Sequence, residues 1–291
     1  MPIRKILVPL LGTDVDRTVL NTGLAVAKNF GAQVVGLFVR PDPSEALPYL
    51  GDGVSGQVIE DLLQAAKEGA DAAAARAKSH LNSVAETAGL PVVEKGNVIL
   101  PSACFVEKIG RRDMVVTEES RLSDLVLFGD DGSDGGLAGD VITGDALEAA
   151  LMSAGRPILI APHTQPKEIG KTIAIGWDDS SEAAHAVTAA IPFLKQAAKV
   201  VILCIGGDEL DPGPGSTLAD YLALHGVQAG VHLVDAGGRF VGEVLLEQAG
   251  QCGADLMVMG GYGHSRLREL IIGGATRHVR SHATLAVLMS H

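Results

Sequence analysis

The chain alternates short apolar runs with longer segments in which apolar residues recur at helical spacing. Five runs in the first half are short enough to be buried strands, at residues 3–9, 33–39, a position near Val92, 124–129 and 157–161. The segments between them are expected to form helices, the second of which is long and rich in alanine, at residues 14–30, 54–88, 102–111 and 144–154. Strands that alternate with helices predict a parallel sheet covered by helices on both faces.

The same plan begins again after a linker at residues 163–168. Four apolar runs of the second half match runs of the first half, at residues 171–176, 199–205, 255–260 and 285–289. A helix is expected at residues 180–196, and the segment 217–226 replaces the long alanine-rich helix. We therefore predict two doubly wound α/β domains in tandem, residues 1–163 and 169–291, with the ligand crevice of each at the carboxyl ends of its strands.

Composition restricts both the core and the partners. Apolar residues make up 47% of the chain but aromatic residues only 3%, so the cores must be packed with aliphatic side chains. The net charge is −12, which argues against binding to nucleic acid or to an anionic membrane surface. A phosphate site in such a protein has to be built locally, from backbone groups.

Other sequence features favour a cytoplasmic protein without membrane contact. No apolar run approaches the roughly 20 residues that would cross a bilayer, and Met1 leads directly into a strand, not into a signal peptide. The wide spacing of Cys104, Cys204 and Cys252 fits neither a zinc site nor a disulfide framework.

A glycine-rich stretch near the C-terminus carries the clearest functional signal. The apolar run that starts at Asp255 leads into Gly260 and Gly263, and a second glycine pair, Gly273 and Gly274, opens a helix. Glycine lets backbone N–H groups approach a ligand closely, and a helix N-terminus offers free donors and a partial positive charge. The stretch therefore predicts an anion site, and phosphate is the usual anion.

The spacing of these glycines resembles the universal stress protein family in its tandem two-domain form. Two residues separate Gly260 from Gly263 and nine separate Gly263 from Gly273, as in the family's ATP-binding members, while Gly274 stands where Ser or Thr is usual. The resemblance implies Rossmann-like domains with five-stranded parallel sheets. It also implies that the last strands of the two domains, 157–161 and 285–289, pair within the chain, with room left for a homodimer.

The resemblance further implies an adenine nucleotide as ligand. The candidate cofactor is ATP with Mg²⁺, or no cofactor at all. By match to the family, the residues expected to hold it are Gly176, Trp177, Asp178, Ile205, Gly260, Gly263, Gly273, Gly274, Ala275 and Thr276. The hydroxyl missing at Gly274 removes a hydrogen bond worth roughly 1.5–3 kcal/mol. Asp178 equally fits a helix start with acidic residues in its first turn, and Trp177 equally fits plain packing.

The first domain departs from this pattern. Leu11 stands where the family has Asp, eleven residues separate Gly132 from Gly144, and Asp145 takes the Ser/Thr position. A carboxylate there repels phosphate, so we interpret this domain as a structural or regulatory partner that does not bind ATP. The nearby acidic residues lack the spacing of a calcium loop, so no metal site is predicted.

Two alternatives stay open. One is an interaction module of the same fold that binds no nucleotide. The other is a slow ATPase, although the chain has neither a Walker lysine motif nor a convincing acid–base pair, and we predict no catalytic residue.

Overall fold

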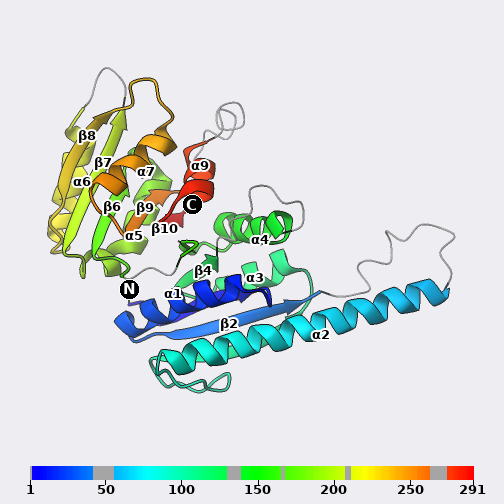
Figure 1. The fold of residues 1–291 in the computed structure, drawn as a ribbon. Helices are drawn as coiled ribbons and strands as arrows, with labels where there is room; N and C mark the ends of the chain where they lie inside the picture. Colours follow the sequence, from blue (N-terminus) through cyan, green and yellow to red (C-terminus); the bar gives the residue numbers. More distant parts are fainter. Residues whose placement is uncertain (1, 42–55, 130–138, 165–167, 207–210, 263–273) are drawn as a thin grey trace.

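The computed structural model describes residues 2–41, 56–129, 139–164, 168–206, 211–262 and 274–291, without the side chains of 139–145. Strands and helices alternate throughout, as the pattern predicts (Figure 1). The first half contains β1 (Lys5–Leu10), α1 (Val15–Phe30), β2 (Gln33–Arg40), α2 (Gly56–Thr87), β3 (Ser102–Ile109), α3 (Arg112–Ser120), β4 (Leu125–Gly129), α4 (Gly139–Ser153) and β5 (Ile158–Ala161). The second half contains β6 (Thr172–Gly176), α5 (Ser181–Leu194), β7 (Lys199–Gly206), α6 (Gly213–Leu224), β8 (Gly230–Asp235), α7 (Val241–Gln251), β9 (Leu256–Gly260), α9 (Ala275–His282) and β10 (Ala286–Ser290).

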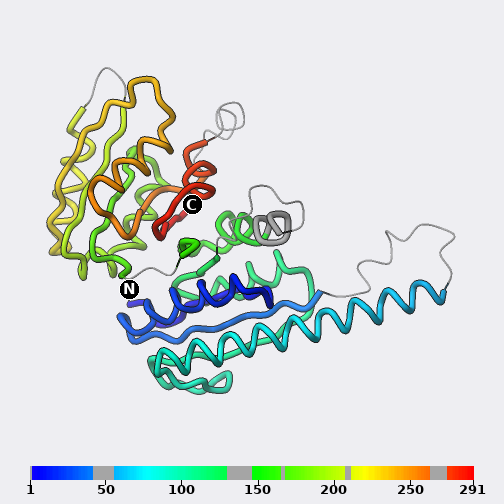
Figure 2. Tube along the Cα trace, viewed as in Figure 1, coloured from blue at the N-terminus to red at the C-terminus, as the bar shows by residue number. Residues whose placement is uncertain are grey.

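The ten strands in the described part of the chain form one sheet, in the order β3-β2-β1-β4-β5-β10-β9-β6-β7-β8. Neighbouring strands are parallel except at the centre, where β5 and β10 run antiparallel with Leu159 opposite Leu288. Each half contributes five strands in the same relative order, and the tube in Figure 2 follows the chain from one half into the other. This architecture confirms the predicted α/β fold of two Rossmann-like units in tandem.

Two apolar layers, one on each face of the sheet, form the core. Helices α1, α2, α5 and α6 cover one face, and α3, α4, α7 and α9 cover the other. Because side chains alternate along a strand, Ile6 and Val8 of β1 enter the first layer and Leu7 enters the second. Each layer contains residues of both halves of the chain.

The repeat extends to a pair of aspartates that begin matching strands. The carboxylate of Asp124, just before β4, accepts hydrogen bonds from the backbone N–H groups of Arg4 and Lys5, at 2.8 and 2.9 Å. Asp255, just before β9, accepts them from Gly170, Lys171 and Thr172, at 2.6 to 3.2 Å. In each half, therefore, an aspartate fixes the start of the first strand against the start of the fourth.

One predicted element is wrong. Residues 102–111 were expected to be helical, but residues 102–109 form the edge strand β3, and the helix α3 starts only at Arg112. All eight residues of β3 pair with β2, but the buried ones lie among the first five, while Glu107, Lys108 and Ile109 at its end are partly or fully exposed. The strand expected near Val92 is reduced to an isolated bridge between Val92 and Ala103. The pattern also missed β8, a second edge strand, because most of its residues are exposed and polar positions interrupt its apolar run.

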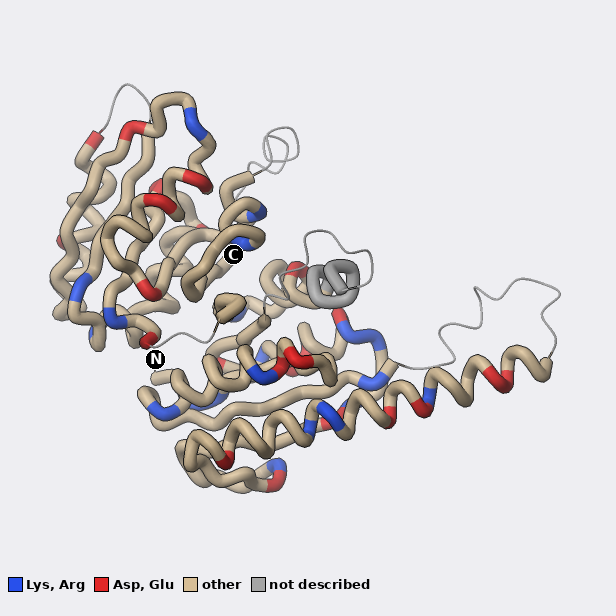
Figure 3. The backbone as a smooth tube through the Cα atoms, viewed as in Figure 1, with Lys and Arg blue, Asp and Glu red and all other residues tan. Residues whose placement is uncertain are grey.

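Helix α2 is longer than the sheet that it covers. Its buried residues all lie in its second half, from Ala74 to Ala85, while its first half extends past the sheet (Figure 1). Acidic and basic residues are interspersed over both halves of the chain (Figure 3). Over the described residues, no helix has both the length and the apolar character that a bilayer span needs.

Candidate functional site

A cleft opens at the carboxyl ends of β6, β7 and β9. Strand β6 lies between the other two, and the chain leaves it towards β7 while β9 lies on its other side, which is the type of position where open α/β sheets bind ligands. The cleft has a cavity volume of about 130 Å³ and opens to solvent. It is lined by Gly176, Trp177, Asp178, Ser180, Glu182, Leu203, Ile205, Val241, Leu245, Met259, Gly260, Ala275 and Thr276.

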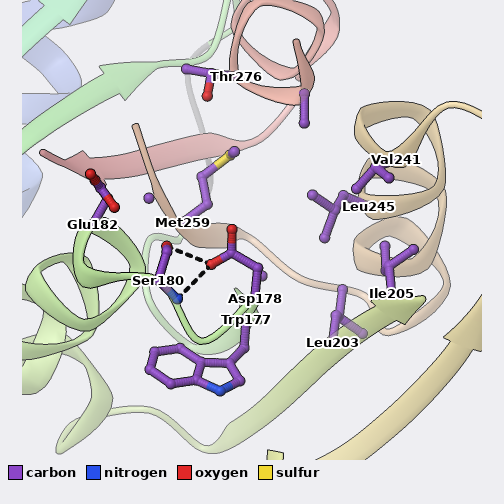
Figure 4. A pocket seen from close by; sticks show the side chains of 13 residues that line it. Trp177, Asp178, Ser180, Glu182, Leu203, Ile205, Val241, Leu245, Met259 and Thr276 are labelled. Atoms are coloured by element: carbon purple, nitrogen blue, oxygen red, sulfur yellow. Dashed lines mark hydrogen bonds between the residues drawn. The ribbon is translucent and has the colours of Figure 1, made fainter. Parts of the chain in front are cut away.

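One wall of the cleft is apolar. Leu203 and Ile205 lie two residues apart on β7, so both point to the same face of the sheet (Figure 4). Val241 and Leu245 lie one turn apart on α7 and complete this wall. A Cβ atom at Gly176 would lie 3.1 Å from Cδ2 of Leu245, so glycine at the end of β6 allows α7 to approach this closely.

The opposite wall is polar and is organised by the start of α5. Oδ1 of Asp178 accepts hydrogen bonds from the N–H and the hydroxyl of Ser180, at 3.2 and 2.6 Å (Figure 4). The Ser180 oxygen in turn accepts a bond from the N–H of Ala183 and caps α5. Asp178 therefore lines the cleft and also supports a helix cap, so the two interpretations of this residue are compatible.

Trp177 lines the cleft beside these polar residues. Its backbone N–H donates to the carbonyl of Leu203 at 3.0 Å, and its ring packs partly against the apolar core. Figure 4 shows the indole turned away from Met259 and Thr276. Its Nε1 is buried and has no hydrogen-bond partner among the described residues. This orientation favours a packing role for the ring.

The glycine turn and α9 form the end of the cleft. A Cβ atom at Gly260 would lie 2.8 Å from the backbone nitrogen of Ala183, so only glycine allows β9 to meet α5 here. Helix α9 starts after Gly274 without a side-chain cap and without an acidic residue in its first turn. Thr276 is buried in that turn, and its hydroxyl oxygen lies 3.4 Å from the N–H of Tyr262. Among the described residues, the first turn of α9 therefore lies at the cleft without a side-chain cap.

The structure brings seven of the ten expected residues to this cleft, namely Gly176, Trp177, Asp178, Ile205, Gly260, Ala275 and Thr276. Gly274 precedes α9 directly but is not among the lining residues. Gly263 and Gly273 lie outside the described residues.

Sequence reasoning missed six lining residues: Ser180, Glu182, Leu203, Val241, Leu245 and Met259. Two of them had a usable signal, since Leu203 shares a strand face with Ile205 and Met259 directly precedes Gly260. Val241 and Leu245 reach the cleft only through the tertiary packing of α7. Within the described ranges, no group of three or more His, Cys, Asp or Glu side chains is placed to hold a metal ion.

Comparisons with known proteins agree with this architecture. A model of the Universal stress protein family matches residues 170–291. A universal stress protein from Archaeoglobus fulgidus DSM 4304 has 16% sequence identity and a TM-score of 0.67, over 98% of this chain and 94% of its own. A putative universal stress protein from Pseudomonas aeruginosa UCBPP-PA14 has 16% identity and a TM-score of 0.57, over 98% and 92% of the two chains.

A protein described as functionally unknown, from Pseudomonas aeruginosa PAO1, has 17% identity and a TM-score of 0.54, again over 98% of this chain and 92% of its own. No curated protein sequence matches the chain. The structural likenesses concern the fold and extend over both halves. The chain thus has the fold of universal stress proteins in a tandem arrangement, and its residues 170–291 form a domain of the universal stress protein family.

Proposed function

We propose that the second half of the chain binds an adenine nucleotide, ATP with Mg²⁺ or a related one, in the cleft between β6, β7 and β9, and that this binding serves a regulatory role in the stress response. The observation that carries the proposal is the position of the start of α9, which has no side-chain cap, at the end of the cleft and directly beside the apolar wall that α7 carries. A cleft that combines an apolar wall with polar groups at fixed positions is typical of sites for small molecules and cofactors.

Each part of an adenine nucleotide has a matching part of the cleft. The flat, weakly polar base fits against Ile205, Val241 and Leu245. Both hydrogen bonds from Ser180 go to Oδ1 of Asp178. The other carboxylate oxygen, Oδ2, can accept a hydrogen bond from a ribose hydroxyl. The phosphate fits the start of α9, where backbone donors and the helix dipole favour an anion.

We further propose that the protein is cytoplasmic. Its three cysteines are all free. Thiols in this state persist where the compartment keeps them reduced.

The proposal is tested by equilibrium titration of the full chain with adenosine, AMP, ADP and ATP, each with and without Mg²⁺. We expect saturable binding of at least one of them, and we expect Val241→Trp to abolish it. Val241 is 42% exposed at the cleft, so the larger side chain fills the cleft without disturbing the core. Leu224→Trp is the matched control, because Leu224 is 87% exposed and does not line the cleft. Absence of binding for every ligand, or equal binding by Val241→Trp, would contradict the proposal.

A further inference from the structure

The polar side of the cleft carries two carboxylates, Asp178 and Glu182, and no Lys, Arg or His among its described lining residues. We propose that Glu182 limits the phosphate charge that the cleft accepts, so that it binds adenosine or adenosine monophosphate in preference to free ATP. This inference rests on the nucleotide site proposed above and names the ligand class of that site.

Glu182 is held firmly at the point where the phosphate region begins. Its side chain belongs to the first turn of α5, and the residue is only 4% exposed. A Cβ atom at Gly260 would lie 3.0 Å from Cβ of Glu182, so this residue packs directly on the last residue of β9. The Ser181 hydroxyl donates to Oε2 of Glu182 at 2.9 Å. The carboxylate therefore sits beside the glycine turn.

The two helices that start at the cleft differ in their electrostatics. Helix α5 has a serine cap and Glu182 in its first turn, so its N-terminus is satisfied by its own residues. Helix α9 has neither a side-chain cap nor an acidic residue there. Figure 4 shows Glu182 and Thr276 on the same side of the cleft, opposite Leu203 and Ile205. A nucleotide with its base on the apolar wall and its phosphates towards α9 thus brings these phosphates towards Glu182.

Burial decides which of the two carboxylates matters. Asp178 is exposed, so water and salt screen its charge. Glu182 is buried, and charges that are shielded from water repel each other more strongly. A hydrogen-bond donor that already binds the Glu182 carboxylate is also unavailable to a phosphate. Each added phosphate charge therefore weakens binding, while Mg²⁺ reduces the penalty by neutralising part of the phosphate charge.

The test compares adenosine, AMP, ADP, ATP in EDTA and Mg-ATP on the full chain by calorimetry. For the wild type we expect ATP in EDTA to bind about tenfold more weakly than adenosine or AMP, with Mg²⁺ closing much of this gap. Glu182→Gln keeps the size and shape of the side chain, and we expect it to strengthen ATP binding about tenfold but adenosine binding less than about twofold. Glu86→Gln, at an exposed glutamate of α2, changes the net charge equally and should leave the ligand order unchanged.

The outcomes separate this inference from the proposed function. If none of the five ligands binds, the proposed nucleotide site is wrong. If adenosine binds but ATP in EDTA binds equally tightly or more tightly, only the selectivity of Glu182 is wrong. The wild-type series alone makes this distinction, so it holds even if Glu182→Gln fails to fold. Equal strengthening of ATP binding by Glu182→Gln and Glu86→Gln would also overturn the inference, because it would indicate a general charge effect.

Discussion

The backbone N–H of Gly12 donates a 2.8 Å hydrogen bond to the carboxylate of Asp16. The N–H of Leu11 donates to the same carboxylate at 2.9 Å. The Asp16 side chain therefore occupies the backbone N–H donors of the turn after β1. Helix α2 covers this turn, and its Arg76 donates to the Gly12 carbonyl at 2.8 Å. In the second half, the corresponding turn after β6 faces the cleft. These contacts favour the interpretation that the first half does not bind a nucleotide at this turn.

Replacing Gly12 should separate α2 from the turn. Gly12 has a φ of 74°, and an added Cβ atom would lie 2.4 Å from the Ala73 carbonyl oxygen. We expect Gly12→Ala to lower the free energy of unfolding by at least about 1–3 kcal/mol from backbone strain alone, measured by urea denaturation. Gly69→Ala is the control, because Gly69 lies inside α2 with no atom within 4 Å of an added Cβ. That control should gain roughly 0.5–1 kcal/mol. Wild-type stability of Gly12→Ala would show that α2 does not press on this turn.

The buried charges around Asp16 should make stability depend on pH. Burial raises the pKa of Asp16 above 3.8, against the lowering effects of the Leu11 and Gly12 hydrogen bonds, His80 and Arg112. Burial also lowers the pKa of Arg112 to about 10. Because the folded protein binds the Asp16 proton more tightly than the unfolded chain does, the Asp16 contribution is fully present below the unfolded pKa. It is lost as pH rises from about 3.8 through the raised folded pKa.

Asp16→Asn removes this titration. Relative to the wild type, the variant should therefore become progressively more favourable as pH rises above about 3.8. Denaturant unfolding of both proteins between pH 3.5 and pH 7 measures the difference. Asp14→Asn is the control, because Asp14 is exposed at the N-cap position of α1 and its carboxylate makes no capping hydrogen bond. A difference between Asp16→Asn and wild type that stays constant with pH would contradict the assigned cause.

Asp124 and Asp255 should be equivalent stabilisers of the two halves. Each carboxylate accepts backbone N–H groups from the start of the first strand of its half. Removing an acceptor from such donors costs about 1–3 kcal/mol, so Asp124→Ala and Asp255→Ala should each lower the free energy of unfolding by about that amount. Chemical denaturation of both variants measures the effect. Asp220→Ala, at an exposed residue of α6, is the control, and a loss as large in this variant would refute the assigned role.

Local patterns predicted the parts of the molecule that local rules control. The repeat and the buried strands follow from periodicity. Glycine at position 260 was expected from the spacing of the glycines, and the structure adds the close contact of β9 with α5 as a second reason for it. The edge strand β3 was mistaken for a helix because an edge strand buries only part of its surface and so loses the continuous apolar run of a central strand.

Residues of the cleft that depend on tertiary packing could not be predicted in this way. Val241 and Leu245 line the apolar wall only because α7 packs on β7 and against Gly176 at the end of β6. Glu182 has the sequence context of an ordinary acidic residue in a first helical turn, which is usually exposed. Its burial results from the contact between α5 and Gly260, two elements far apart in the chain.

Gly274 should control the affinity of the site for phosphate in both directions. It occupies the N-cap of α9 with φ −55° and ψ 150°, a conformation that any residue adopts and that Ser and Asp favour at this position. We expect Gly274→Ser to add a hydrogen bond to phosphate and to tighten Mg-ATP binding by about tenfold. We expect Gly274→Asp to cap α9 equally well but to weaken Mg-ATP binding, because its carboxylate takes the place of the phosphate charge. Titration with Mg-ATP and with adenosine distinguishes an effect on phosphate binding from a general change of the cleft. Adenosine has no phosphate and should bind both variants about as well as the wild type. If Gly274→Ser and Gly274→Asp both tightened or both weakened Mg-ATP binding, the phosphate would not lie at the start of α9.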